Sequence, residues 1–187
     1  MAGAADERLV ARIAAAQHGV VTGRQLRESG FGPRAILRRV EGGWLVRLHV
    51  GVYQVGVFGG PFAAEMAALL ACGMRSAISH ESSMAVYGVC SRPVGIVDVC
   101  VPRGSTSRRD GVRSHRATLP PCDVVVRQRV RVTTPARTLL DLAASTSPDE
   151  LEGRLLMAGY RVLRVTWRQI TREPELVVAM IATALAA

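Results

Sequence analysis

Arginine is the residue type with which this chain could do most chemistry. All 24 residues counted as Lys or Arg are arginines, against 15 acidic residues, and the formal net charge is +9. Arginine binds phosphate through paired hydrogen bonds and reads the edge of guanine, so this composition favours a nucleic-acid partner. A GC-rich genome imposes the same preference for arginine without any function. The position of the charge is therefore more informative than its amount.

The positive charge is concentrated in the first three quarters of the chain. Residues 1–58 hold eight arginines against four acids, residues 59–147 hold eleven against six, and residues 148–187 hold five against five. Any electrostatic contact with DNA is therefore expected before about residue 147.

One run of arginines has helical spacing. Pro33 suits the first position of a helix that runs to about Glu41. At 100° per residue, one side of this helix carries Ile36, Leu37 and Val40, and the opposite side carries Arg34, Ala35, Arg38 and Arg39. We expect the first face to pack and the second to contact DNA. The simpler alternative is a solvated helix face.

The neighbouring residues predict elements that would position this helix. Thr22 and Gln25 form a capping box for a helix that ends at Ser29, and the glycines of residues 30–32 provide a turn. A first helix has Leu9, Ile13 and Ala16 on its packing face. Residues 44–48 and 52–55 predict two strands around a candidate wing at residues 49–51.

This order of elements is that of a winged helix-turn-helix, in which the second helix of the motif enters the major groove. We therefore expect double-stranded DNA as the partner. The predicted DNA-binding residues are Arg24, Gln25, Arg27, Arg34, Arg38, Arg39, Arg47 and His49.

Other residues that could do chemistry do not form a predicted catalytic or metal site. His80 and Glu81 are adjacent on a helix and do not face each other, while Ser79 suits the N-cap. His115 stands between arginines on a predicted strand, which favours a basic surface ladder over a general base. The four cysteines lack paired C-x-x-C spacing. We expect no enzyme activity, no metal and no cofactor.

The rest of the chain predicts an α+β fold in three parts. Glycines and a proline at residues 56–61 predict a linker. It divides a winged helix-turn-helix domain (1–58) from a mixed α+β domain (59–147), and a strand-helix tail (148–187) follows. The middle part alternates helices and strands, and a helix begins after Thr134 at Pro135. The polar loop 103–111, rich in arginine, is either a solvated loop or a contact for phosphates or an acidic partner.

The N-terminus has no signal-peptide pattern, because charged residues interrupt residues 1–17, and no run of 18 apolar residues exists. We expect a cytoplasmic protein without a membrane partner.

Five segments carry a family resemblance, and the most specific of them runs Thr-Pro-Ala-Arg-Thr-Leu-Leu-Asp-Leu at residues 134–142. The others are residues 20–22, 34–40, 51–53 and 78–83. Together they resemble AbiEi-type antitoxins of type IV toxin–antitoxin systems over roughly residues 5–145. The resemblance implies a DNA-binding winged helix, an antitoxin-like domain, repression of the chain's own operon at operator repeats, and opposition to a nucleotidyltransferase-like toxin encoded nearby. A solitary regulator is equally compatible.

The tail has a second resemblance. Residues 158–167 and 171–174 resemble the last strand and helix of very-short-patch-repair-like nuclease domains, whose catalytic hairpin has no room here. Asp149, Glu150 and Glu152 follow Pro148 as acids of a first helical turn, which they favour electrostatically. A shortened endonuclease or its inactive remnant is thus the alternative to a regulator. We expect the strand Tyr160–Thr166 and the helix Glu173–Leu185 to pack on the middle domain or on a second copy in a homodimer, with Trp167 partly buried.

Overall fold

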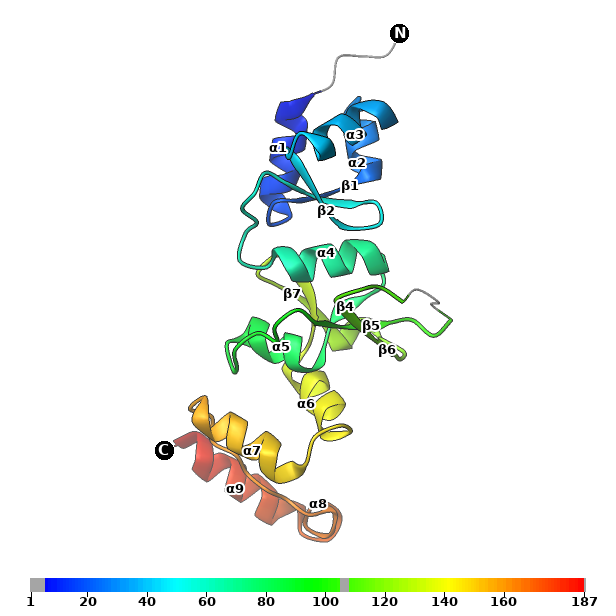
Figure 1. The fold of residues 1–187 in the computed structure, drawn as a ribbon. Helices are drawn as coiled ribbons and strands as arrows, with labels where there is room; N and C mark the ends of the chain where they lie inside the picture. The colour runs from blue at the N-terminus through cyan, green and yellow to red at the C-terminus, as the bar shows by residue number, and fades with distance from the viewer. Residues whose placement is uncertain (1–5, 105–107, 187) are drawn as a thin grey trace.

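The computed structural model describes residues 6–104 and 108–186, and it confirms the α+β class. The chain is elongated, with the N-terminal elements at one end, a second sheet in the middle and the tail helices at the other end (Figure 1). The elements are α1 (Glu7–Ala16), β1 (Val20–Thr22), α2 (Gly23–Glu28), α3 (Pro33–Glu41), β2 (Leu45–His49), β3 (Val52–Val55), α4 (Ala63–Cys72), β4 (Ala77–Ile78), α5 (His80–Tyr87), β5 (Val97–Val101), β6 (Val112–Arg116), the 3-10 turn η1 (Pro121–Asp123), β7 (Val124–Arg127), β8 (Val130–Thr133), α6 (Pro135–Ala143), α7 (Pro148–Met157), α8 (Trp167–Arg172) and α9 (Pro174–Ala186).

Residues 6–56 have the order of elements that the sequence predicts for a winged helix-turn-helix. The capping box at the start of α2 is present, because the Thr22 hydroxyl accepts from the Gln25 amide and the Gln25 side chain accepts from the Thr22 amide. Gly30 has φ of +87° at the turn, and Pro33 opens α3. The strand β1 was not predicted. It pairs antiparallel with β3, which completes a three-stranded sheet in the order β1-β3-β2.

The predicted packing face of α1 was wrong by one residue. Val10 and Ala14 are buried and Ala16 is exposed, whereas the prediction placed Leu9, Ile13 and Ala16 inwards. Leu9 and Ile13 flank the buried pair and are half-buried.

The N-terminal sheet is buried on both faces. In β1, Val20 faces away from the three helices while Val21 faces them, because successive side chains of a strand alternate. Val21 packs with Leu26, Phe31 and other residues of the helical core. Val20 joins Met66 of α4 and the valines of the middle sheet in a second cluster. One apolar core therefore crosses the predicted boundary at residue 58.

The middle part contains a five-stranded mixed sheet in the order β6-β5-β4-β8-β7. The pairs β4–β8 and β5–β6 are parallel, and β4–β5 and β7–β8 are antiparallel. α4 lies between this sheet and the N-terminal sheet, and α5 lies on the opposite side with α6 below it (Figure 1). The short strand β4 was not predicted from the sequence.

The tail differs from the prediction in two respects. Residues 160–166 are extended but form no strand in the described part of the chain, so the predicted strand Tyr160–Thr166 was wrong. Trp167 was expected to be partly buried, and its exposed fraction is 78%. The predicted last helix is present as α9. Asp149 and Glu150 lie in the first turn of α7 as expected, whereas Glu152, predicted for the same turn, lies in the next one. A strand needs a neighbour for its backbone hydrogen bonds, and the tail offers none.

Candidate nucleic-acid interface

The exposed face of α3 is the centre of the candidate interface. Ile36 is buried in the helical core, and Ala35 and Val40 pack against that core. Leu37, which was predicted to pack, is 57% exposed and lies on the outer side with Arg34 and Arg38. The predicted helix was correct, but its faces are rotated by about one residue. The outward arginines of α3 are therefore Arg34 and Arg38.

Arg39 belongs to the inner side of α3 instead of the predicted cationic face. Its guanidinium lies 4.5 Å from the centre of the Phe31 ring and 5.3 Å from that of Trp44. Nη2 donates to the Glu7 carboxylate of α1 at 2.6 Å. Arg39 therefore connects α1 to α3 and covers the aromatic end of the core. Sequence periodicity alone could not distinguish this role of Arg39 from that of an exposed arginine.

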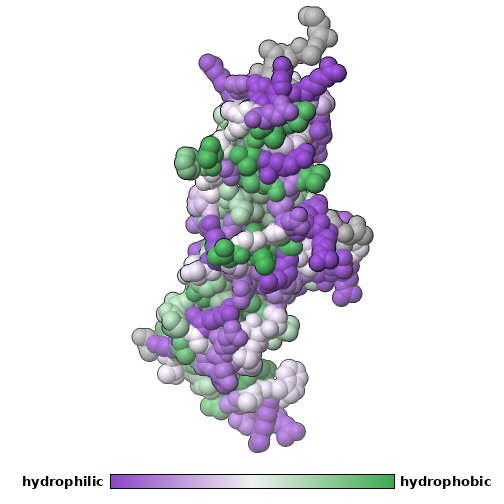
Figure 2. Space-filling model, viewed as in Figure 1, coloured by the Kyte–Doolittle hydropathy of each residue, from purple (hydrophilic) through white to green (hydrophobic). Residues whose placement is uncertain are grey.

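Arg34 and Arg38 form no ion pair with any described residue, and both side chains are exposed. Hydrophilic residues gather at the end of the molecule that carries α3 (Figure 2). Two arginines separated by one helical turn on an exposed face can both reach into a groove of DNA, where arginine pairs with guanine O6 and N7.

The start of α2 lies beside the wing. Arg24 and Arg27 are exposed, and Arg24 lies 3.6 Å from Glu28 one turn further on. The backbone N–H of Gly23 donates to the carbonyl of Gly51 at 2.8 Å, which attaches this end of α2 to the hairpin. The Gln25 side chain accepts hydrogen bonds from Thr22, so its carbonyl oxygen is already used in the helix cap.

The predicted wing is the turn between β2 and β3, and it is present. Val50 at its tip is 93% exposed, and Gly51 has φ of +73°. Arg47 is exposed with its guanidinium 5.9 Å from the centre of the Tyr53 ring. The β2–β3 register shifts between Arg47 and His49, as in a β-bulge.

The bulge turns His49 toward the middle part of the chain. His49 lines a hollow of about 290 Å³ together with Glu65 and Asp110. Burial lowers the pKa of His49, and the nearby Arg109 lowers it further while Asp110 opposes this. The lowered pKa favours the neutral form of His49, which is less suited to phosphate than the arginines around it.

His115 does not belong to a basic surface ladder, as the sequence had suggested. Its Nε2 lies 2.8 Å from Oδ1 of the buried Asp98, and its ring stacks on that of His80 with centres 3.6 Å apart. Arg113 also reaches Asp98, at 3.4 Å. The Ser79 hydroxyl hydrogen-bonds the His80 ring instead of capping α5. Strand pairing of β5 with β6 brings Arg113 and His115 to Asp98, and sequence spacing could not show it.

The specific segment at residues 134–142 has a structural role. Thr134 caps α6, and Arg137 forms ion pairs with Asp123 and Asp141, each at 2.8 Å. The Thr138 hydroxyl lies 2.7 Å from that of Ser83 on α5. These contacts fasten α6 to α5 and to η1, so the motif positions elements of the middle part.

Neither a group of metal ligands nor a membrane-spanning helix is present among the described residues. Over residues 6–104 and 108–186, no three His, Cys, Asp or Glu side chains are grouped so that they could hold a metal ion. Within the same residues, every helix is too short or too polar to span a bilayer.

In the loop 103–111, residues 105–107 lie outside the described residues, and Arg109 donates from Nε to the Ala71 carbonyl at 2.9 Å.

The winged helix matches a known family. Residues 8–56 match the sequence model of a family described as transcriptional regulator, AbiEi antitoxin. The match does not extend into the middle part or the tail. The resemblance of the tail to a nuclease domain has no support from this match or from the extended segment at residues 160–166.

Solved structures with some similarity to this chain include one from Mycobacterium tuberculosis. The crystal structure of the RV2827C protein from Mycobacterium tuberculosis is 18% identical to this chain, covers 80% of it and 70% of its own chain, and has a TM-score of 0.46. No curated protein matches the chain.

Proposed function

We propose that this protein is a DNA-binding transcriptional regulator of the antitoxin type. The observation that carries the proposal is the outward pair Arg34 and Arg38 on the second helix of a complete helix-turn-helix motif, within the residues that match a regulator family. In this arrangement α3 enters the major groove, where Arg34 and Arg38 contact base edges. Arg24, Arg27 and Arg47 contact the phosphates on either side.

The target is double-stranded DNA with operator repeats near the protein's own gene, and the result of binding is repression. The proposed antagonist is a nucleotidyltransferase-like toxin encoded beside it. Co-expression tests this part: the protein should relieve growth arrest by the product of the adjacent gene, and no relief would leave a solitary regulator.

A homodimer is the assembly that fits repeated operator sites, because two-fold related subunits place two recognition helices on two half-sites. The tail provides apolar surface for it. Trp167, Ile181 and Leu185 are exposed, and α7 to α9 contain no buried residue among those described. We propose that the tails of two copies cover one another.

Selection of DNA by the purified protein tests the proposed function. Duplexes with a randomised centre are incubated with the full chain, and the bound fraction is sequenced over successive rounds. The proposal predicts enrichment of one motif, arranged as a repeat. A pool that stays random, with binding that depends only on salt, would contradict sequence-specific regulation.

A further inference from the structure

Arginines outside the winged helix line a hollow that begins at its base. This upper hollow, of about 600 Å³, lies where the end of α1 and the start of α2 meet α4 and the β7–β8 hairpin. Its arginines are Arg24 from α2 and Arg129 and Arg131 from the hairpin. Arg24 is next to Gly23, whose N–H is bonded to the wing at Gly51. The hollow is thus continuous with the candidate DNA interface.

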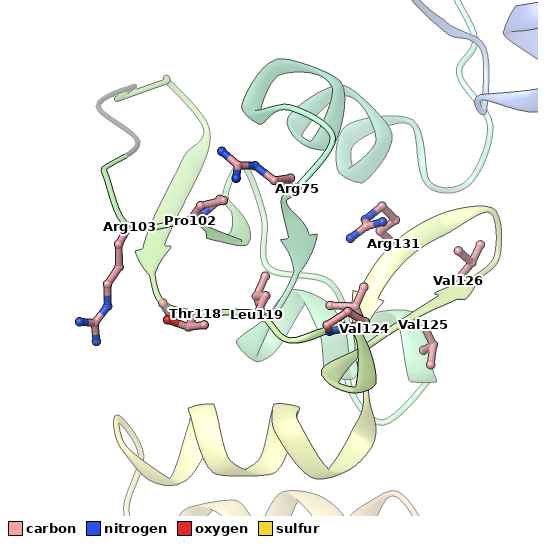
Figure 3. Close-up of a pocket in the computed structure, with 11 residues that line it drawn as sticks. Arg75, Pro102, Arg103, Thr118, Leu119, Val124, Val125, Val126 and Arg131 are labelled. Atoms are coloured by element: carbon pink, nitrogen blue, oxygen red, sulfur yellow. The ribbon is translucent and has the colours of Figure 1, made fainter.

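A second hollow follows the first. This lower hollow, of about 540 Å³, lies at one end of the middle sheet, where Arg75 precedes β4 and Arg103 follows β5. Arg131 lines both hollows, so they adjoin. Figure 3 shows Arg75 and Arg131 below α4, with Arg103 across the hollow from Arg131. We call Arg24, Arg129, Arg131, Arg75 and Arg103 the arginine track.

The arginine track has one acidic neighbour, Glu28, which lies 3.6 Å from Arg24 at its upper end. None of the described residues that line the two hollows is acidic. Arg75 and Arg103 are exposed and have no ion pair with a described residue. Arg129 and Arg131 bond only backbone carbonyls, of Ala15 at 2.8 Å and of Ser76 at 3.1 Å, and each keeps further N–H groups free for a ligand.

Hydrogen bonds fix the position of the β7–β8 turn, which carries Arg129, relative to the winged helix, which carries Arg24. The β7–β8 turn is formed by Gln128 and Arg129, which both have positive φ, at +50° and +63°. Non-glycine residues adopt this conformation at a cost, and they keep it where the surroundings fix it. Here His18 Nε2 lies 2.6 Å from the Gln128 carbonyl, and Arg129 bonds the end of α1. The turn is therefore attached to the winged helix.

We propose that the arginine track is a second DNA-backbone site, on which phosphates beyond the winged-helix contacts are bound by the middle part of the chain. This inference rests on the proposed DNA binding and adds a partner surface to it. Phosphate is the ligand that matches exposed arginines in hollows whose described lining has no acid. Arg24, which pairs with Glu28, lies at the end of the track where the winged helix would meet DNA. An acidic protein segment is the competing occupant.

The salt dependence of DNA binding tests the track, because each phosphate contact adds about 0.9 to the slope of log affinity against log salt concentration. The test variant is Arg75→Ala with Arg131→Ala. The charge control is Arg75→Lys with Arg131→Lys, and the position control is Arg168→Ala with Arg172→Ala on α8. Affinity is measured by fluorescence anisotropy on a long duplex carrying the selected motif, from 50 to 300 mM salt (about a sixfold range), with hydroxyl-radical footprints of each complex.

If the track binds phosphates, the slope of log affinity against log salt concentration should be smaller in magnitude by about 2 for the alanine variant. The preference for the selected motif should be unchanged. The alanine variant should also lose the protection of the DNA backbone on either side of the winged-helix footprint. The lysine variant and the α8 variant should keep the wild-type slope, and unchanged circular dichroism shows that the variants fold. If the wild type binds its motif and the alanine variant has the same slope and footprint, the track serves another partner and this inference is wrong. If the wild type binds no duplex, the proposed function fails as well.

Discussion

At the scale of single residues, the arginines of α3 divide into two kinds that the sequence does not separate. Arg34 and Arg38 point outwards, whereas Arg39 covers Phe31 and Trp44 and pairs with Glu7. A guanidinium over aromatic rings in a half-buried place contributes about 0.5–2 kcal/mol. The positive charge of Arg39 is therefore engaged in contacts within the protein.

Arg39→Ala should lower the free energy of unfolding by about 1–2 kcal/mol, because it removes the ring contacts and the Glu7 pair together. Arg38→Ala, its neighbour without a described ion pair, should change stability by less than about 0.5 kcal/mol. Urea unfolding followed by circular dichroism gives both values. Equal effects of the two substitutions would show that Arg39 is an ordinary surface residue.

At the scale of elements, two capping boxes allow a matched comparison. Thr22 with Gln25 begins α2 inside the packed core, and Thr166 with Gln169 begins α8 in the exposed tail. Thr22→Ala should cost about 1 kcal/mol of global stability, the usual worth of such a cap. Thr166→Ala should leave the main unfolding transition unchanged. A similar loss from both would show that the tail unfolds together with the rest.

The stacked histidines give the middle part a pH dependence. Burial lowers the pKa of His80, and the charge of His115 lowers it further, against the opposing effects of Asp141 and Asp98. The unfolded chain then binds more protons than the folded chain below about pH 6.5, so the free energy of unfolding should fall as the pH drops through that value and stay level above it. The lowered pKa of His49 acts in the same direction.

His80→Asn isolates the contribution of His80, since asparagine tolerates the positive φ of 49° at this position and does not titrate. The variant should show a weaker loss of stability between about pH 7 and pH 5, measured by thermal unfolding. A wild-type slope in the variant would assign the pH dependence to other groups.

Local sequence signals predicted most single elements. The capping box at Thr22, the glycine turn and Pro33 determined the helix-turn-helix, because caps and turns depend on adjacent residues. The packing face of a helix was harder to predict than its ends. A rotation of α3 by about 100° around its axis is enough to turn Leu37 outwards and Arg39 inwards. The Thr166–Gln169 pair offered the same signal as Thr22–Gln25 for the unpredicted α8. Pairing of β5 with β6, which joins His115 to Asp98, had no local signal.

At the scale of the whole molecule, the winged helix and the middle part share one apolar core around α4. Two hydrogen bonds from the β7–β8 turn also join them. The tail is different, because the described residues of α7 to α9 include none that is buried, although Arg154 of α7 pairs with Glu81 of α5. Its apolar side chains are left exposed, and this predicts association.

Sedimentation velocity over a range of protein concentrations should show a dimer that dissociates on dilution. Ile181→Glu, with a charge in the centre of α9, should give a monomer with unchanged secondary structure. Exposed Val94→Glu, on a loop of the middle part, serves as the control for an added charge and should remain dimeric. A wild type that stays monomeric at tens of micromolar (roughly the range in which weak interfaces associate) would contradict the dimer.

Binding of the selected duplex by Arg34→Ala with Arg38→Ala is the most direct measurement of the central claim, that α3 reads DNA. Anisotropy titrations at one fixed salt concentration compare this variant with the wild type and with Arg168→Ala plus Arg172→Ala, which removes the same charge from the tail. We predict that the α3 variant loses about 1–3 kcal/mol for each base contact and no longer prefers the selected over a scrambled duplex, while the tail variant matches the wild type. Wild-type affinity and discrimination in the α3 variant would contradict the account.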